Sequence, residues 1–348
     1  SWSGTKLFEI NHSSAKTKSI QLSSNALGID SATATELNMG DSETLIALLN
    51  FSRKYYPAEH YALIIWGHGT GYRFKEACKN RAVAIDDTSG SFMSTAELRK
   101  AIKSGMGNEK IELLAFDTCF GSELEELYEL KQEANWFAGV VGLQEASGWD
   151  YSLWMNKEIE NCTKGSEVAK LIEKQYSAKG RNDFSIVKMD AVTEIFESFI
   201  QFSKEAALLI KDEKSAQTIQ EQIINNSRAY AAAGTMSNPV YVEISAMAKV
   251  LQDSFPQLKD CTATLNDSLK RATSETYSSS QDIFPIGIYF CSLNEKKEVL
   301  KSISPFYTQG SGVEDQCQFV QTAIEYVPTA KQKGSLLDKL LGNYKFSL

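Results

Sequence analysis

Two short apolar runs, YALIIW at 61–66 and IELLAF at 111–116, constrain the fold more than any other feature of this sequence. Runs of this length and texture are typical of strands buried on both faces of a parallel sheet. Helical patterns surround them: Asp41 is suited to the N-cap of one helix, and Ser94 and Ser122 each begin a capping-box pattern. Strands that alternate with helices predict an α/β protein, a three-layer α/β/α sandwich with a mostly parallel sheet.

The pattern of predicted helices and strands changes after residue 190. Before that point we expect further strands at 6–10, 18–22, 82–85, 137–143 and 184–189. Beyond it, long helical patterns cover 193–228 and 258–276, with isolated strand candidates at 240–244 and 286–290. We therefore predict an α/β domain over 1–190 and a largely helical C-terminal region over 191–348, whose late strands could rejoin the sheet.

Composition narrows the classes of function. The net charge is -8 and the pI is about 5.2, which argues against nucleic acid as a partner. No apolar run is long enough to span a bilayer, and the opening SWSGTKLFEI carries no signal peptide. The six cysteines form no CxxC pair, so neither a zinc ribbon nor a redox motif is expected, and their disulfide state stays open.

The run at 61–66 leads directly into Gly67, His68 and Gly69. In open parallel sheets, ligands bind just beyond the carboxyl ends of the strands. Glycines on both sides of His68 remove side-chain bulk and let a substrate backbone approach closely. A neutral imidazole is suited to general acid or base chemistry there. The same sequence pattern would also fit a structural histidine on a turn.

The run at 111–116 leads into Asp117, Thr118 and Cys119. Cys119 lies where a strand gives way to a helix, whose N-terminus favours a thiolate, while Glu123, Glu125 and Glu126 oppose it. A cysteine at this place could also be a small buried hydrophobe. Residues i and i+2 of a strand share a face, so Asp117 either lines a pocket beside Cys119 or caps the following loop.

These blocks resemble one known family. YALIIWGHGTGY, IELLAFDTCFGS and the later VGLQEASGWDYSLW together are similar to the clostripain-like cysteine peptidases, which share a clan with caspases, gingipains and legumain. Caspases also place their histidine about 50 residues before the cysteine. The resemblance covers roughly 38–190 and implies a caspase-like sandwich, a His/Cys dyad, and cleavage of polypeptides after Arg or Lys.

Residue by residue, the resemblance makes His68 the acid/base and Cys119 the nucleophile. The backbone N–H groups of Gly69 and Cys119 become candidates for the oxyanion hole. Asp117 becomes the acidic floor of the specificity pocket, with Glu145 and Trp149 in the segment expected to line the substrate groove.

Relatives of this kind mature by self-cleavage in a loop after the histidine. The stretch FKEACKNRAVAIDD occupies that place, and Lys79 and Arg81 are the candidate cleavage points in the 75–82 loop, which could equally be an ordinary surface loop. No cofactor is required and no metal site is assigned. Some members depend on calcium, for which Asp86, Asp87 and Glu145 are candidate ligands or merely solvated or structural carboxylates.

By the same resemblance we expect a monomer that is secreted or held in a bacterial cell envelope, its leader absent from this chain. Two other functions compete with the peptidase. One is a non-catalytic protein that binds peptides or partners on the same scaffold. The other is a nucleotide-binding protein that uses GHGTG as a phosphate loop, but the sequence lacks both the GxGxxG spacing and the Walker lysine.

Overall fold

A four-stranded sheet forms the centre of the molecule. The computed structural model describes residues 4–11, 18–69, 83–107, 109–210, 213–226, 229–230, 241–276 and 284–290. The strands lie in the order β3 (Ala62–Trp66), β6 (Ile111–Asp117), β7 (Ala134–Val140) and β8 (Phe184–Lys188). β3, β6 and β7 are parallel, and β8 is antiparallel to β7. The mostly parallel sheet predicted from the two apolar runs is confirmed.

Side chains alternate between the two faces of this sheet, and each face has its own core. Leu114 and Phe116 of β6 belong to a large core that includes side chains of α2 (Thr95–Met106), α3 (Leu124–Leu130) and α6 (Val192–Leu209). Leu113 and Ala115 belong to a smaller core built with α5 (Gly165–Ser177) and Trp154. Helices therefore cover both faces, as a three-layer sandwich requires.

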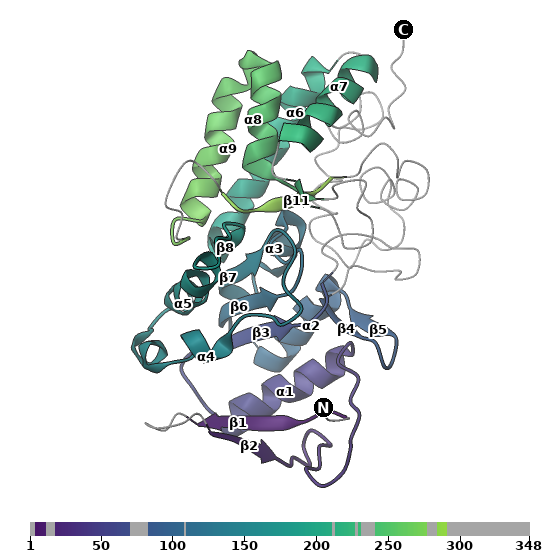
Figure 1. Cartoon of the computed structure of the whole chain (residues 1–348), viewed down its shortest axis with the longest axis vertical. Coiled ribbons are helices and arrows are strands. Elements are labelled where there is room, and N and C mark those ends of the chain that lie inside the picture. Colours follow the sequence, from purple (N-terminus) through teal and green to yellow (C-terminus); the bar gives the residue numbers. More distant parts are fainter. Residues whose placement is uncertain are drawn as a thin grey trace.

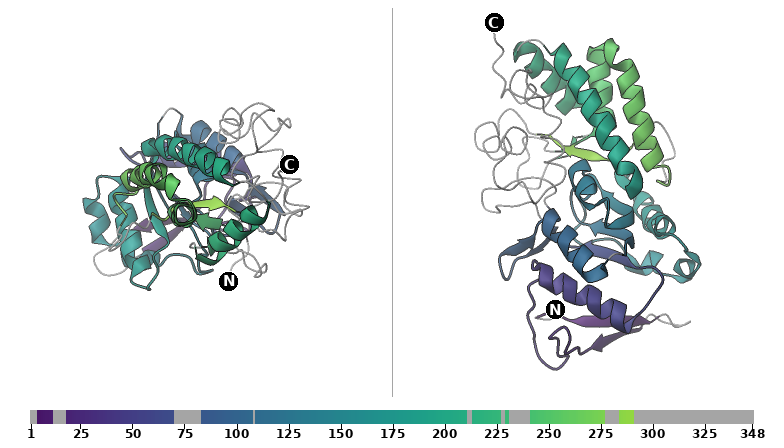
Figure 2. Two further views of the ribbon diagram at one scale, coloured as in Figure 1. Left: turned by 90° about the horizontal axis from the view of Figure 1, so that it is seen from above. Right: turned by 180° about the vertical axis from the view of Figure 1, so that it is seen from behind.

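The remaining helices extend the sandwich at its two ends. α1 (Ser42–Tyr55) packs on α2 beside the hairpin of β1 (Leu7–Asn11) and β2 (Lys18–Leu22). At the opposite end of the long axis, α6 and α9 pack together and α8 contacts α7 and α9 (Figures 1 and 2). Their bounds are α7 (Glu213–Asn226), α8 (Ile244–Ser254) and α9 (Lys259–Ala272). No helix among the described residues combines the length and apolarity that crossing a bilayer demands.

Short strands complete the described structure. β4 (Val83–Asp86) pairs with β5 (Ser91–Met93) as a hairpin before α2. In the C-terminal region, β9 (Ala229–Tyr230), β10 (Tyr241–Glu243) and β11 (Gly287–Tyr289) form a three-stranded sheet. The sequence suggested that the late strands could rejoin the four-stranded sheet, but within the described residues they form a sheet of their own. An isolated bridge between Glu123 and Gly287 is one of the contacts between the two parts.

Two local expectations fail for physical reasons. β3 is only half-buried because it ends the order of described strands, so it is not the doubly covered strand that its apolar run predicts. Ser122 does not cap α3, whose N-cap is Glu123 without a side-chain hydrogen bond. The Ser122 hydroxyl instead bonds to Ser185 at 2.5 Å in the core. By contrast, the capping box of Ser94 with Glu97 and the N-cap of Asp41 are both confirmed.

Candidate active site

The register of β3 against β6 determines what lies at the carboxyl edge of the sheet. Trp66 pairs with Asp117, and the N–H of Gly67 donates to the carbonyl of Asp117 at 3.4 Å. Two residues further along each strand come His68 and Cys119. The two predicted dyad residues therefore follow adjacent, in-register strand ends, and His68 is exposed while Cys119 is a half-buried free thiol.

Gly69 explains how closely the two loops approach. A Cβ atom at this position would lie 2.4 Å from the carbonyl oxygen of Cys119 and 2.6 Å from Oγ1 of Thr118. Only a glycine allows this contact without displacing backbone. The loop after β3 and the loop after β6 are thus packed against each other at the position of the expected oxyanion-hole donors.

The chain turns sharply directly after Cys119. Phe120 has φ +52°, a left-handed conformation that costs a residue with a side chain about 1–2 kcal/mol. Its ring stacks on Tyr241 at 4.6 Å, and its N–H donates to the carbonyl of Gly142 at 2.8 Å. These contacts hold the turn, which presents the thiol at the end of the strand rather than inside the core.

The sulfur of Cys119 meets the backbone of one residue. The N–H of Gln144 donates to Sγ at 3.3 Å, and the thiol reaches the Gln144 carbonyl at 3.6 Å. The sequence predicted that a helix N-terminus would serve the sulfur, but α3 begins only at Leu124. The donor comes from the loop after β7, a residue that sequence reasoning missed.

Asp117 is the last residue of β6 and is buried, with 1% of its surface exposed. Its Oδ2 accepts hydrogen bonds from the N–H of Trp149 at 2.8 Å and from the hydroxyl of Tyr151 at 3.0 Å. Within the described part of the chain, Oδ1 makes no hydrogen bond. Burial raises the pKa of Asp117, although these two bonds, the Gln144 side chain and the Lys179 charge favour the charged form.

Gly148 brings the loop after β7 against this carboxylate. It has φ +69°, and a Cβ there would lie 2.6 Å from Oδ2 of Asp117 and 2.4 Å from Nε1 of Trp66. Trp66 is 59% exposed beside it. A flat aromatic surface and a buried carboxylate with a free oxygen therefore meet at one point of the edge.

The two other predicted substrate-binding residues line one pocket with Gln144. The walls of this pocket also include Leu153, Trp154 and Tyr176. Trp149 is buried and reaches Asp117 through its backbone, whereas the Glu145 carboxylate pairs with Lys179 at 3.1 Å near the surface. The structure thus places Glu145 and Trp149 in a pocket that shares Gln144 with the candidate nucleophile, although Cys119, His68 and Asp117 are not among its lining residues.

The candidate calcium ligands do not form a cluster of carboxylates among the described residues, and calcium dependence stays a prediction. Asp86 accepts backbone N–H bonds from Met39, Thr88 and Ser89 at 2.8–3.0 Å, which lower the pKa of this carboxyl and occupy its oxygens. The residues for which coordinates are described contain no group of three or more His, Cys, Asp or Glu side chains that could hold a metal ion. Asp86 therefore has a structural role in its turn. Lys79 and Arg81 lie outside the described residues.

A mostly parallel sandwich with a cysteine and a histidine at adjacent strand ends defines the class of caspase-like cysteine peptidases. The comparisons agree: the model of the clostripain family matches residues 7–320. The chain therefore belongs to the clostripain family. It is 31% identical to clostripain of Hathewaya histolytica over 134 residues, which are 37% of this chain and 25% of that protein. The match thus spans about a quarter of the curated relative.

Two solved structures share the fold over most of the chain. An inactive zymogen of a C11 protease from Parabacteroides distasonis has a TM-score of 0.62 at 16% identity, covering 91% of this chain and 85% of that one. A secreted C11 cysteine protease from Bacteroides thetaiotaomicron, in complex with an irreversible peptide inhibitor, has a TM-score of 0.61 at 14% identity, with coverage of 92% and 85%. At these identities the likeness shows the fold, and it confirms the caspase-like sandwich predicted from the sequence.

Proposed function

We propose that this chain is a cysteine endopeptidase that uses Cys119 as nucleophile and His68 as acid and base. The observation that carries the proposal is the register of Trp66 with Asp117, because it brings the segments of both residues to one edge. The close contact of Gly69 with Cys119 supports the same arrangement. Membership of the clostripain family supports the reaction class.

In the proposed mechanism, the Cys119 thiolate attacks the carbonyl carbon of the scissile peptide bond. The N–H groups of Gly69 and Cys119 stabilise the oxyanion that forms. His68, which carries the proton taken from the Cys119 thiol, then donates it to the departing amine and leaves an acyl group on sulfur. A water molecule, deprotonated by His68, attacks this thioester and releases the second product.

We propose further that Asp117 selects Arg or Lys before the scissile bond. Its Oδ1 makes no hydrogen bond with described residues, so a guanidinium or ammonium group could supply its missing partners. The exposed Trp66 indole beside it offers a surface on which an arginine could stack. The charge of a basic side chain would also favour the ionised carboxylate and so offset the burial that raises the pKa of Asp117.

The experiment is hydrolysis of four matched peptides with Arg, Lys, Asp or Asn before the cut, by the native chain and by Cys119→Ala and Asp117→Asn. We expect cleavage after Arg and Lys, no cleavage by Cys119→Ala, and loss of the basic preference in Asp117→Asn. A preference for Asp would exclude the role of Asp117. A folded native chain that binds peptides without cutting them would establish the alternative, a peptide-binding protein on this scaffold.

Self-processing and secretion are part of the proposal. One relative of the same fold is an inactive zymogen and another is secreted. Cleavage after Lys79 or Arg81 is expected to occur in the native chain and to stop in Cys119→Ala, as N-terminal sequencing of the fragments would show. A Cys119→Ala chain that still splits there when pure would exclude self-cleavage.

A further inference from the structure

The contact between Gln144 and the sulfur of Cys119 raises the question of what holds Gln144 in place. A backbone N–H that donates to sulfur stabilises the thiolate over the thiol. The bond is 3.3 Å long and is made by a loop residue, so it depends on where the loop is fixed. The residue before Gln144 is Leu143, and its carbonyl belongs to the same peptide unit as the Gln144 N–H.

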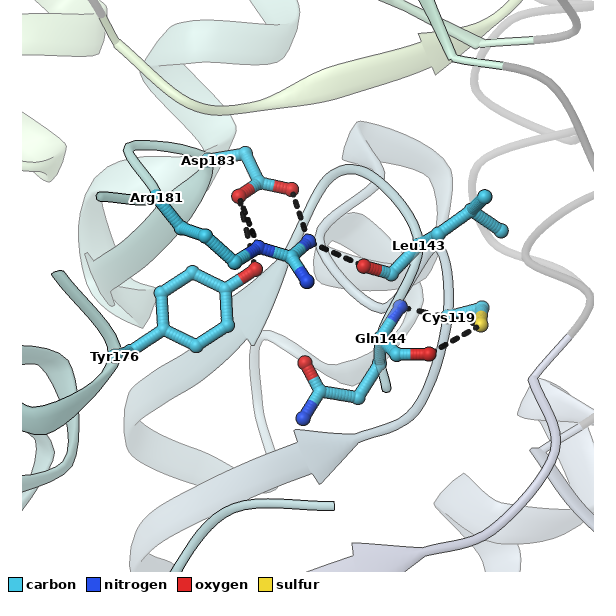
Figure 3. A network of polar contacts seen from close by, with 6 residues as sticks. All are labelled: Cys119, Leu143, Gln144, Tyr176, Arg181 and Asp183. Atoms are coloured by element: carbon cyan, nitrogen blue, oxygen red, sulfur yellow. Dashed lines mark hydrogen bonds and ion pairs between the residues drawn. The ribbon is translucent and has the colours of Figure 1, made fainter. Parts of the chain in front are cut away.

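The anchor of that carbonyl is Arg181. Its Nη2 donates to the carbonyl oxygen of Leu143, and the same guanidinium donates to Asp183, from Nη2 at 3.2 Å and from Nε at 3.4 Å (Figure 3). The planar fork of an arginine can reach a carbonyl and a carboxylate at once, which the single ammonium group of a lysine does less well. Arg181 thus connects the loop to Asp183.

Asp183 and Tyr176 are themselves fixed by regular structure. Asp183 immediately precedes β8, and its carbonyl accepts the N–H of Val141 at 3.0 Å. The hydroxyl of Tyr176, in α5, donates to Oδ1 of Asp183 at 2.8 Å, and its ring lies 4.7 Å from the guanidinium carbon. Tyr176 and Asp183 are both buried, so the network has a rigid base.

We propose that Arg181 is a positioning residue for the nucleophile: by holding the Leu143 carbonyl, it keeps the Gln144 N–H directed at Sγ of Cys119. The consequence for peptide cleavage rests on the proposed function, but the consequence for the thiol does not. Arg181 touches neither the sulfur nor the substrate carbonyl in this role. It acts through the peptide unit that joins Leu143 to Gln144.

The test measures how fast iodoacetamide alkylates each cysteine of the native chain, Arg181→Ala and Arg181→Lys between pH 5 and pH 10, by mass spectrometry. Cys162 and Cys261 are free thiols that reach the carbonyls of Glu158 and Leu258 rather than residues of the network, and they serve as internal references. In Arg181→Ala we expect Cys119 to react about tenfold more slowly at pH 6–7, with the rates converging at high pH, because the charge-assisted hydrogen bond is weakened. Arg181→Lys should lie between the two.

The matched control is Arg271→Ala, which removes another arginine–carboxylate pair, with Glu194, on the surface of the helical bundle. It should leave the Cys119 profile unchanged. On an arginine peptide, Arg181→Ala should lower kcat because the thiolate is less stabilised, and it should also raise KM, because Arg181 lines the pocket together with Glu145 and Trp149.

An Arg181→Ala profile that superposes on the native one would overturn the proposal, whatever happens to Tm. If that variant fails to fold, Tyr176→Phe removes only the hydroxyl that orients Asp183, and it should shift the Cys119 profile in the same direction by a smaller factor. An unchanged profile there would also overturn it. A shifted profile in a chain that cuts no peptide would uphold the positioning role and reject the peptidase.

Discussion

Replacing Gly69 with alanine tests the contact on which the whole site depends. The added Cβ would lie 2.4 Å from the carbonyl oxygen of Cys119, whereas ordinary contacts begin at 3.4 Å. The nearest atoms are the backbone carbonyl oxygen of Cys119 and two atoms of the buried Thr118 side chain, so the loops after β3 and β6 must separate by about 1 Å. The alanine keeps the backbone N–H, so no oxyanion-hole donor is lost.

A separation of about 1 Å between reacting groups costs on the order of a hundredfold in rate. Overpacking a filled contact of this kind also costs about 1–3 kcal/mol of the free energy of unfolding. We therefore expect Gly69→Ala to remain folded with a lowered Tm, and its kcat on an arginine peptide to fall by about two orders of magnitude.

The control is Gly165→Ala. A Cβ there would lie 2.4 Å from the carbonyl oxygen of Glu112, a backbone clash of the same kind near the opposite end of β6. Urea unfolding should show similar losses of stability for the two variants, while steady-state kinetics should show a large loss of kcat for Gly69→Ala alone. Native kcat in a Gly69→Ala chain, or equal loss in both variants, would refute the close approach of the two loops.

Two further predictions concern buried carboxyls. Burial raises the pKa of Asp117 above its ordinary value of 3.8, so the folded chain binds this proton more tightly than the unfolded chain and stability falls as the pH rises through that range. Asp117→Asn should therefore unfold at higher urea than the native chain at pH 7, with the gain shrinking toward pH 4; a gain that grows on acidification would contradict the sign. Burial, and then the charges of Glu125, Glu126 and Glu243, raise the pKa of Glu123 well above 4.5, and neither of its oxygens makes a hydrogen bond with described residues. Glu123→Gln should flatten the loss of stability between pH 5 and pH 8, and equal slopes for the two chains would show that Glu123 is not the titrating group.

The sequence predicted the strands at the centre and the residues at their ends because both depend on local patterns. The apolar runs at 61–66 and 111–116 became β3 and β6, which pair in parallel. His68, Asp117 and Cys119 could be located because each directly follows such a run.

The two capping-box patterns show that tertiary contacts can override a local sequence pattern. Ser94 and Ser122 begin the same S-x-x-E pattern, yet only Ser94 forms the box. The carbonyl of Ser122 accepts the N–H of Gly287 at 2.9 Å, and its hydroxyl reaches Ser185. Glu123 is extended, whereas a cap at Ser122 would need Glu123 to be the first helical residue. Residues far away in the sequence supply these partners, and no window around Ser122 contains them.

The loop after β7 was the least predictable part of the site because its contribution is backbone. The N–H of Gln144 reaches the sulfur of Cys119, and the N–H of Trp149 reaches the carboxylate of Asp117. Every residue except proline has an N–H, so neither donor can be recognised from the residue type in the sequence. Both bonds come from one short segment, which makes the placement of the proposed nucleophile and that of the proposed specificity carboxylate depend on each other. A change that moves this segment must therefore alter thiol reactivity and charge recognition together.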